Sequence, residues 1–310
     1  MNSEISIITS TYYRNDLLRE AIESVLEQDY EPVEYVVIDD SGEGYATPIL
    51  EEYDEVTPII RDEEAGWART YTQGVEESTG KYIQFLDDDD YLLEGKLKKT
   101  ATILQRNPDV GVSYCGVVRG DEGCFLPDLK VSGDILKSAL RFQTFPLWTG
   151  SMLMERSVLE DCLPLAEYAG DTDLKIELAR RTEFDYVDEC LAYYRRDQSR
   201  KWVGPKRFEE VRRVLRNQAE LYDEYPEIRR QVLKNWYQRQ GMYWLEERMW
   251  SPKAINCFAR SVYYADGKAA KFKSSVGTIA SLFGRPGWVA ATSLQDAVRG
   301  SGTESRARNA

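Results

Sequence analysis

The chain has 310 residues, a net charge of −13 at pH 7, a pI near 4.8 and no histidine. So acidic a surface repels phosphate backbones, which excludes a general nucleic-acid-binding role. The lack of histidine excludes imidazole bases and His-ligated zinc. No stretch approaches the roughly 20 apolar residues of a membrane span, and the first residues lack the pattern of a secretory signal. We therefore expect a cytoplasmic protein.

The cysteine content predicts thiols and not a disulfide framework. The five cysteines are an odd number, and none are spaced as a CxxC pair. We therefore expect buried thiols, with neither disulfides nor a zinc site. Arginine outnumbers lysine, and acids outnumber both together. This balance fits a protein kept soluble at high salt, and it also fits an ordinary acidic cytosolic protein.

Strand and helix patterns alternate over the first hundred residues, which predicts an α/β fold with a mainly parallel sheet flanked by helices. Short β-branched or apolar runs predict strands, and apolar residues at helical spacing predict helices. The expected strands are 5–9, 35–38, 56–60 and 81–86, and the expected helices are 17–26, 47–53 and 66–78. Ligands bind beyond the carboxyl ends of such strands. Three polar segments lie there: 10–14, 39–42 and 87–90.

The pattern changes twice further along the chain. Strands at 110–118, 148–154 and 191–195 and a helix at 173–181 are expected first, and from residue 205 the pattern is helical and highly charged. We predict a first domain at 1–204, a helical appendage at 205–298 that contains one tetratricopeptide-like hairpin, and a disordered tail at 299–310.

Four consecutive aspartates, Asp87 to Asp90, follow the expected strand 81–86. Adjacent carboxylates repel one another unless a positive charge compensates them. At the end of a buried strand they would form an oxygen-rich site for Mg²⁺ or Mn²⁺, and such an ion can bridge a diphosphate. The alternative is a solvated acidic loop, but the preceding apolar strand favours the metal site.

The pair Asp39 and Asp40 also follows an expected strand. Carboxylates there could accept hydrogen bonds from a nucleotide base or ribose. They could equally form a turn or cap a helix, and both interpretations stay open on local evidence.

The order and spacing of several segments resemble the family 2 glycosyltransferases of GT-A fold. The resemblance covers about residues 4 to 200 and rests on residues 6–12, 21–28, 37–42, Gly66 with Ala68-Arg69, 80–90, 149–151 and 170–174. It implies an inverting transfer of a sugar from a nucleotide sugar, most simply a UDP-sugar, to a hydroxyl of a glycan or lipid-linked acceptor.

The resemblance also implies a role for individual residues. The metal would be bound by Asp87 and Asp89, and the catalytic base would be Asp171. The donor nucleotide would be bound by Ser10, Tyr12, Asp39, Asp40, Arg69 and Asp88.

Two departures from the family pattern concern accessory residues. The usual Glu-Asp motif is Gly170-Asp171 here, so Asp173 could share the role of the missing glutamate. Acids in the first turn of a helix also favour its dipole, which is the structural alternative for both aspartates. The late motif ends in Asp197 where the family has histidine, and Asp197 could ligate the metal or do nothing. Trp148 is the best candidate for stacking on a sugar, although core packing is the more common fate of tryptophan.

The sequence also allows two other classes of function: a nucleotidyltransferase, and a non-catalytic nucleotide- or glycan-binding module. A nucleotidyltransferase would usually show a glycine-rich first turn, and residues 10–14 contain no glycine. The acid-rich composition and the helical appendage resemble archaeal enzymes that extend lipid-linked glycans for protein glycosylation. Basic residues after the last motif, among them Arg195, Arg196 and Arg200, could meet the phosphate of such an acceptor or the headgroups at the inner face of the cell membrane, and a solvated charged face is the alternative. Residues 276–289 could be an interfacial anchor, but a packed terminal helix is the plainer interpretation.

Overall fold

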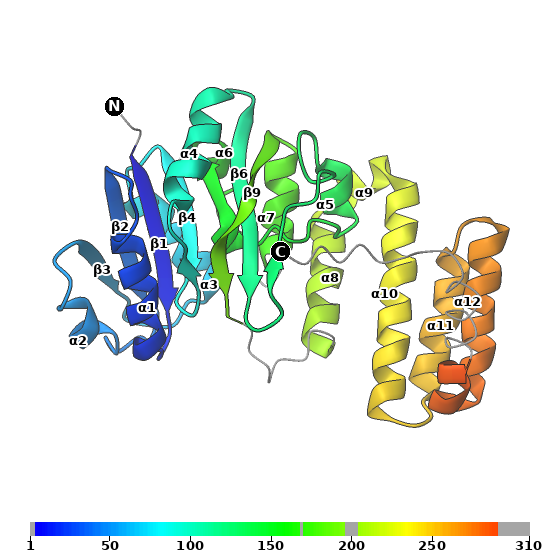
Figure 1. Cartoon of the computed structure of the whole chain (residues 1–310). Coiled ribbons are helices and arrows are strands. Elements are labelled where there is room, and N and C mark those ends of the chain that lie inside the picture. The colour runs from blue at the N-terminus through cyan, green and yellow to red at the C-terminus, as the bar shows by residue number, and fades with distance from the viewer. Residues whose placement is uncertain (1–3, 168–169, 196–203, 291–310) are drawn as a thin grey trace. The chain divides into compact units, whose positions relative to one another are not determined.

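A computed structural model describes residues 4–167, 170–195 and 204–290 of the chain (Figure 1). The chain forms two compact units, residues 1–199 and 200–310, which are described separately.

The first unit contains one nine-stranded mixed sheet with the strand order β3-β2-β1-β4-β8-β6-β9-β5, and β7 pairs with β6 outside this path. The neighbours within β3-β2-β1-β4 are parallel, whereas β8 runs antiparallel to β4 and β6. The strands are β1 (Ile5–Thr11), β2 (Val33–Asp39), β3 (Val56–Ile60), β4 (Tyr82–Asp87), β5 (Tyr91–Leu92), β6 (Val110–Arg119), β7 (Cys124–Phe125), β8 (Met152–Glu155) and β9 (Glu183–Tyr194). The prediction of an α/β fold with helices beside a largely parallel sheet is confirmed.

Helices flank this sheet (Figure 1). They are α1 (Asn15–Leu26), α2 (Thr47–Leu50), α3 (Trp67–Glu77), α4 (Lys96–Arg106), α5 (Leu136–Leu140), α6 (Arg156–Glu160) and α7 (Gly170–Ala179), with the 3₁₀ turn η1 (Thr149–Ser151) before β8. Alternation along the strands explains the two faces, since successive side chains of a strand point to opposite sides. Ile5 and Ile7 of β1 share one core with apolar residues of α1, α2 and α4.

The opposite face of the sheet packs against α3. Ile8 of β1 and Ile38 of β2 lie within van der Waals reach of the Gly74 position. The ring of Tyr71 packs on Phe85 of β4, with centroids 4.4 Å apart. A glycine at position 74 therefore lets α3 lie close to the sheet.

The second unit is helical. It contains α8 (Pro205–Asn217), α9 (Ala219–Glu224), α10 (Pro226–Glu247), α11 (Pro252–Tyr264) and α12 (Gly267–Leu282). α10 and α11 pack closely because Gly241 leaves room for the Phe258 ring, which a Cβ at 241 would approach to 2.7 Å. None of the helices within the described ranges is both long and apolar enough to cross a membrane.

The structure corrects the prediction for two cysteines. Cys124 and Cys190 form a disulfide, with their Cα atoms 6.0 Å apart. Both β7 and β9 pair with β6, so that residues 66 positions apart in sequence become neighbours. Sequence spacing could not reveal this, because the contact depends on strand order. Cys115, Cys162 and Cys257 are free.

The packing of α3 leads to a stability prediction. In Gly74→Ala the new Cβ would lie 2.3 Å from Cγ2 of Ile8. The gain in helix propensity is at most about 1 kcal/mol, whereas overpacking costs about 1–3 kcal/mol, so we expect the free energy of unfolding to fall. Chemical denaturation would measure it. Gly204→Ala, whose Cβ would make only an ordinary 4.0 Å contact, is the control, and equal stability of the two variants would contradict the prediction.

Candidate active site

The three polar segments meet at one edge of the sheet. In the strand register Ser10 of β1 lies between Ile38 of β2 and Asp87 of β4, and Thr11 lies beside Asp39. These parallel strands all end here, and so their following loops converge.

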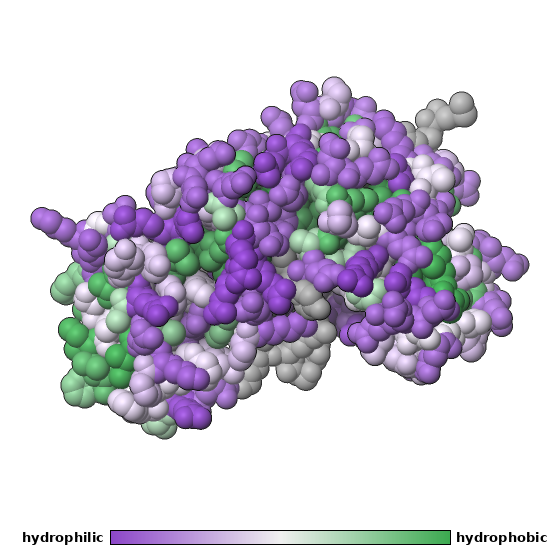
Figure 2. All heavy atoms as spheres, turned by 180° about the vertical axis from the view of Figure 1, so that it is seen from behind, coloured by the Kyte–Doolittle hydropathy of each residue, from purple (hydrophilic) through white to green (hydrophobic). Residues whose placement is uncertain are grey.

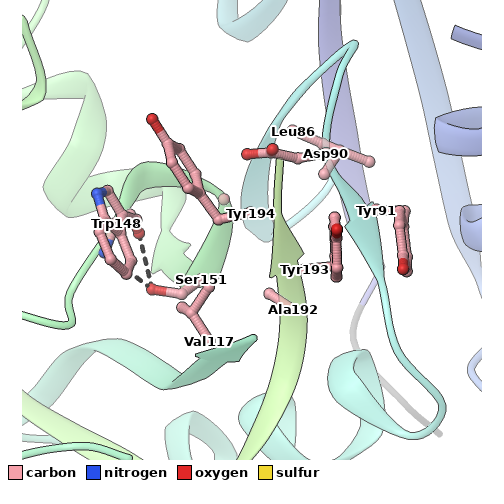
Figure 3. A pocket seen from close by; sticks show the side chains of 10 residues that line it. Leu86, Asp90, Tyr91, Val117, Trp148, Ser151, Ala192, Tyr193 and Tyr194 are labelled. Atoms are coloured by element: carbon pink, nitrogen blue, oxygen red, sulfur yellow. Dashed lines mark hydrogen bonds between the residues drawn. The ribbon is translucent and has the colours of Figure 1, made fainter. Parts of the chain in front are cut away.

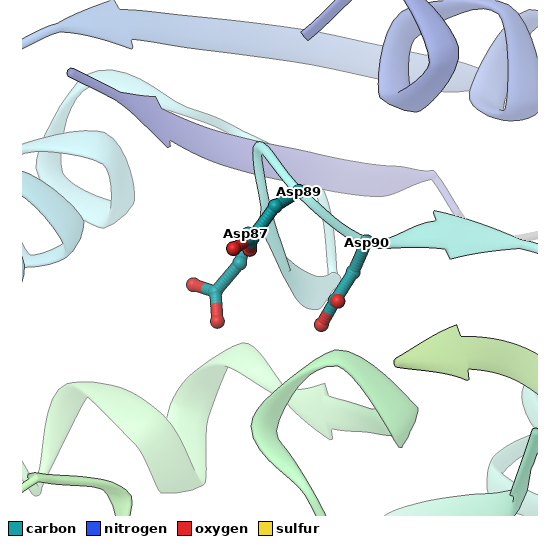
Figure 4. A group of neighbouring side chains, drawn as sticks. All are labelled: Asp87, Asp89 and Asp90. Carbon is teal, nitrogen blue, oxygen red and sulfur yellow. The ribbon is translucent and has the colours of Figure 1, made fainter. Parts of the chain in front are cut away.

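The loop after β4 holds a cluster of three carboxylates. Oxygens of Asp87, Asp89 and Asp90 lie within 4.8 Å of one another (Figure 4). A turn produces this arrangement, since the amide of Asp90 donates to the carbonyl of Asp87 at 3.1 Å. Asp90 is 6% exposed; it belongs to the predicted acidic run, but only Asp87 and Asp89 had been singled out as metal ligands. We call these three residues the acidic cluster.

Asp88 is turned toward the loop that follows β1. Its carboxylate accepts hydrogen bonds from the Thr11 hydroxyl at 2.9 Å, from the amide of Tyr12 at 3.3 Å and from Arg14 at 3.0 Å. The same guanidinium lies 2.8 Å from an oxygen of Asp89. Sequence reasoning missed Arg14, although it is the one basic residue of the 10–14 segment. Asp88 thus joins the first and fourth strands through protein contacts.

A second arginine holds the acidic cluster from the other side. The amide of Arg195 donates to Asp90 at 2.8 Å, and its Nε donates to the carbonyl of Asp89 at 3.0 Å. Its Nη2 pairs with Glu20 of α1 at 2.5 Å. The chain after β9 is thereby fixed against the aspartate loop.

Two carboxylates of the acidic cluster, those of Asp87 and Asp90, have raised pKa values. Burial, followed by the charge of Asp89, raises the pKa of Asp87 to about 6, although a hydrogen bond from Tyr71 opposes the shift. Burial and the charge of Asp87 raise the pKa of Asp90 well above its ordinary value. Carboxylates that resist ionisation together are suited to a divalent cation, and oxygen ligands are those that Mg²⁺ and Mn²⁺ prefer. The donor set fits such an ion.

The two aspartates after β2 stabilise their own loops. Asp39 accepts from the amides of Ser41 at 2.9 Å and Ala46 at 2.7 Å. Asp40 accepts from the amides of Ala65 at 2.9 Å and Gly66 at 2.8 Å, at the start of α3. Both are buried. Of the two interpretations left open by the sequence, turn formation is the one for which the structure shows partners.

Aromatic rings line the outer side of this region. Tyr12 is 46% exposed, and its ring packs edge-on against Tyr13, which in turn contacts Tyr45. Tyr13 and Tyr45 were not predicted. Arg69 projects from α3 and pairs with Glu167 at 2.7 Å in an exposed ion pair.

Asp171 lies in the first turn of α7 and accepts a hydrogen bond from Lys175 at 2.6 Å, one helical turn later. Its charge is among those that raise the pKa of Asp87, so the helix brings it near the acidic cluster. Lys175 was not predicted. Asp173 is 4% exposed, whereas the side chain of Asp171 is 26% exposed. Asp171 is therefore the more accessible of the two.

A small pocket adjoins the acidic cluster (Figure 3). It is lined by Asp90 together with Leu86, Tyr91, Val117, Trp148, Gly150, Ser151, Ala192, Tyr193 and Tyr194. The rings of Trp148 and Tyr194 are stacked, with centroids 5.0 Å apart and planes 7° apart. Phe145 meets Trp148 edge-on and is half exposed. Asp197 lies outside the described residues.

Comparison with known proteins decides the family. The model of glycosyl transferase family 2 matches residues 6–163, just over half of the chain. The chain belongs to this family. Its members with similar sequences include an uncharacterised glycosyltransferase of Rickettsia prowazekii, 28% identical over 198 residues that make up 60% of this chain and 62% of that protein.

A second relative of this chain has a named activity. It is the GalNAc(5)-diNAcBac-PP-undecaprenol beta-1,3-glucosyltransferase of Campylobacter jejuni, 23% identical over 208 residues that cover 62% of this chain and 64% of the relative. This chain thus spans less than two thirds of the length of both relatives.

Solved structures show the GT-A fold. Residues 1–349 of Staphylococcus aureus TarS in complex with UDP-GlcNAc align with a TM-score of 0.62 at 14% identity, covering 98% of this chain and 93% of that TarS fragment. The mannosyltransferase PcManGT of Pyrobaculum calidifontis, in complex with GDP-Man and Mn²⁺, aligns with a TM-score of 0.58 at 16% identity, over 96% and 87% of the two chains.

The charge repulsion in the acidic cluster leads to a prediction about the stability of the protein. Asp90→Asn should raise the melting temperature in EDTA at pH 7 by roughly a few degrees, because it removes a buried charge and keeps an acceptor for the Arg195 amide. A carboxyl with a raised pKa costs stability as the pH rises through that value. The wild type should therefore gain stability relative to the variant as the pH falls from 7 toward about 4, the ordinary pKa of an aspartate, because the pKa of Asp90 is raised in the folded protein.

Thermal denaturation across this pH range would test the prediction. The exposed Asp121→Asn serves as the control. A lower melting temperature for Asp90→Asn at pH 7 would show that Asp90 stabilises the metal-free protein.

Proposed function

We propose that this glycosyltransferase uses a nucleotide sugar, most simply a UDP-sugar, and transfers the sugar with inversion to a hydroxyl of a glycan or lipid-linked acceptor. The observation that carries the proposal is the convergence of three carboxylates, Asp87, Asp89 and Asp90, at the edge where β1, β2 and β4 end. Residues 1–204 would form the catalytic domain, and residues 205–298 the helical appendage.

The donor would lie across this edge. Asp87 and Asp89, with Asp90 beside them, would hold Mg²⁺ or Mn²⁺, which neutralises charge that develops on the diphosphate. Ser10, Tyr12, Asp40 and Arg69 would bind the nucleotide, with Asp39 and Asp88 shaping the loops around it. Their present hydrogen bonds support this positioning role.

Arg14 would have a role in donor binding that the sequence did not suggest. Its guanidinium neutralises Asp88 and Asp89 in the structure. When a cation binds Asp89, Arg14 would be freed to meet donor phosphate oxygens, for which the planar guanidinium is well suited.

Asp171 would act as the catalytic base and take a proton from the acceptor hydroxyl, whose oxygen attacks the anomeric carbon as the bond from that carbon to the nucleoside diphosphate breaks and the diphosphate leaves. The hydrogen bond from Lys175 orients this carboxylate on α7. Asp173, buried in the same turn, would support the helix start. The acceptor sugar would stack on the Trp148 ring. Trp148 lines the same pocket as Asp90, so a sugar bound there would lie beside the acidic cluster.

The acceptor class is inferred from two sources. The Campylobacter relative is named for an acceptor glycan carried on PP-undecaprenol, and the helical appendage resembles that of enzymes that build lipid-linked glycans. We therefore propose a lipid-linked glycan, of the kind used in protein glycosylation, and peripheral action at the cytoplasmic face of the membrane. A screen of UDP-, GDP- and dTDP-sugars for Mn²⁺-dependent hydrolysis would identify the donor.

Removal of a proposed metal ligand should weaken donor binding. In Asp89→Ala, Mn²⁺-dependent binding of the donor found in that screen should weaken at least about tenfold, because charged hydrogen bonds and ion contacts at buried sites exceed 1.4 kcal/mol. Isothermal titration calorimetry with and without Mn²⁺ measures the effect, with Asp121→Ala as the control. Unchanged binding would remove Asp89 from the metal site.

Removal of the proposed base should separate chemistry from binding. Asp171→Asn should lower kcat for transfer by about 10²–10⁴-fold, the usual contribution of a general base, while donor affinity by calorimetry stays within a factor of a few. Glu177→Gln, on the same helix and paired with Arg181, is the matched control. Wild-type turnover in Asp171→Asn would show that another group is the base, and a wild type that binds donor without turnover would favour a binding module.

A further inference from the structure

Helix α12 in the second unit exposes large apolar side chains and buries small ones. Its outward side carries large apolar side chains: Phe272 is 73% exposed, Ile279 60% and Leu282 53%, and the next residue, Phe283, is 74% exposed. Its inward side carries small residues, with Ser274 and Ser281 both buried. A helix that only needs to be soluble has the opposite arrangement.

Specific contacts fix the small residues on the inside. A Cβ on Gly277 would lie 2.8 Å from the Trp288 ring, so that only glycine fits against it. Ser274 accepts a hydrogen bond from Gln238 of α10 at 3.3 Å. The helix therefore cannot rotate to bury Phe272 and Ile279 without losing these contacts.

The exposed apolar surface continues beyond the helix. Arg285 donates its amide to the carbonyl of Met249 at 2.7 Å, and the indole of Trp250 donates to the carbonyl of Leu282 at 3.1 Å. Met249, Trp250 and Val289 are each more than half exposed. Figure 2 shows hydrophobic surface at the lower left, over the C-terminal helices. The resulting surface, called here the α12 face, consists of Met249, Trp250, Phe272, Ile279, Leu282, Phe283 and Val289.

The α12 face lies in a basic segment of an acidic protein. Residues 267–290 include Lys268, Lys271, Lys273 and Arg285 and no aspartate or glutamate, although the whole chain has 53 acids and a net charge of −13. Lys268 and Lys271 are exposed beside Phe272. Aromatic and aliphatic side chains flanked by lysine are the composition of helices that lie in a membrane interface.

We propose that the α12 face binds an anionic lipid surface. The apolar side chains would enter the boundary between headgroups and acyl chains, and the lysines would meet lipid phosphates. A second copy of the chain fits less well, because two such faces would bring like charges together. The interaction extends the proposed function, since a lipid-linked acceptor lies in a membrane, but it needs neither donor nor acceptor.

Vesicle flotation with the full chain tests the proposal. Protein should float with vesicles that contain phosphatidylglycerol, and should float much less with vesicles of phosphatidylcholine alone or in high salt. Phe272→Ser/Phe283→Ser should weaken binding at least about tenfold. Lys268→Gln/Lys271→Gln should weaken it roughly fivefold for each charge. All four side chains are exposed, so the fold should persist.

The control changes a similar pair in the first unit: Leu129→Ser/Lys130→Gln, in which Leu129 is 80% exposed. It should bind vesicles as the wild type does. Failure of the wild type to bind anionic vesicles, or equal binding by all variants, overturns the proposal. Dimers in light scattering that Phe272→Ser/Phe283→Ser disrupts, without vesicle binding, would assign the face to self-association. Because no sugar is present, neither result depends on the transferase activity.

Discussion

The crowding of four carboxylates at the end of β4 is the constraint on which the rest of the site depends. Like charges this close repel unless they are separated or neutralised. The loop solves this by turning Asp88 away to Arg14, while Asp87, Asp89 and Asp90 face one another. Burial, and after it the charges of the neighbouring aspartates, raises the pKa values of Asp87 and Asp90. That residual repulsion is what a divalent cation would relieve.

Two arginines connect this loop to distant parts of the first unit. Arg14 follows the first strand, and Arg195 follows the last, so their contacts with Asp88, Asp89 and Asp90 tie the parallel half of the sheet to the mixed half. The exposed side chains of Tyr12, Tyr13 and Tyr45 follow the strands that end beside the acidic cluster. The pocket with Trp148 and Tyr194 adjoins the cluster at Asp90. In the proposed reaction these would serve the donor base and the acceptor sugar, with the cluster between the two substrates.

The second unit packs its helices through small residues. Its interior uses glycine and serine for close helix packing, at Gly241 against Phe258 and at Gly277 against Trp288. The side of α12 that packs against the rest of the unit carries small residues, so the large apolar side chains Phe272 and Phe283 lie on the solvent side. Exposed apolar side chains lower the solubility of a protein. If the α12 face binds a membrane, the same side chains would hold the proposed catalytic domain near a lipid-linked acceptor.

The sequence by itself determined the α/β class, the strands that end at the site and the acidic loop, because alternation, β-branched runs and a strand followed by charge are local features. It predicted a metal site in the run Asp87 to Asp90 and named Asp87 and Asp89 as its ligands, but it did not single out Asp90. It also missed Arg14, Lys175, helix α4 and the Cys124–Cys190 disulfide. Those depend on which strands are neighbours and which way a turn points each carboxylate. Only tertiary packing decided them, since contacts between residues such as Arg14 and Asp88, 74 positions apart, leave no trace in local sequence patterns.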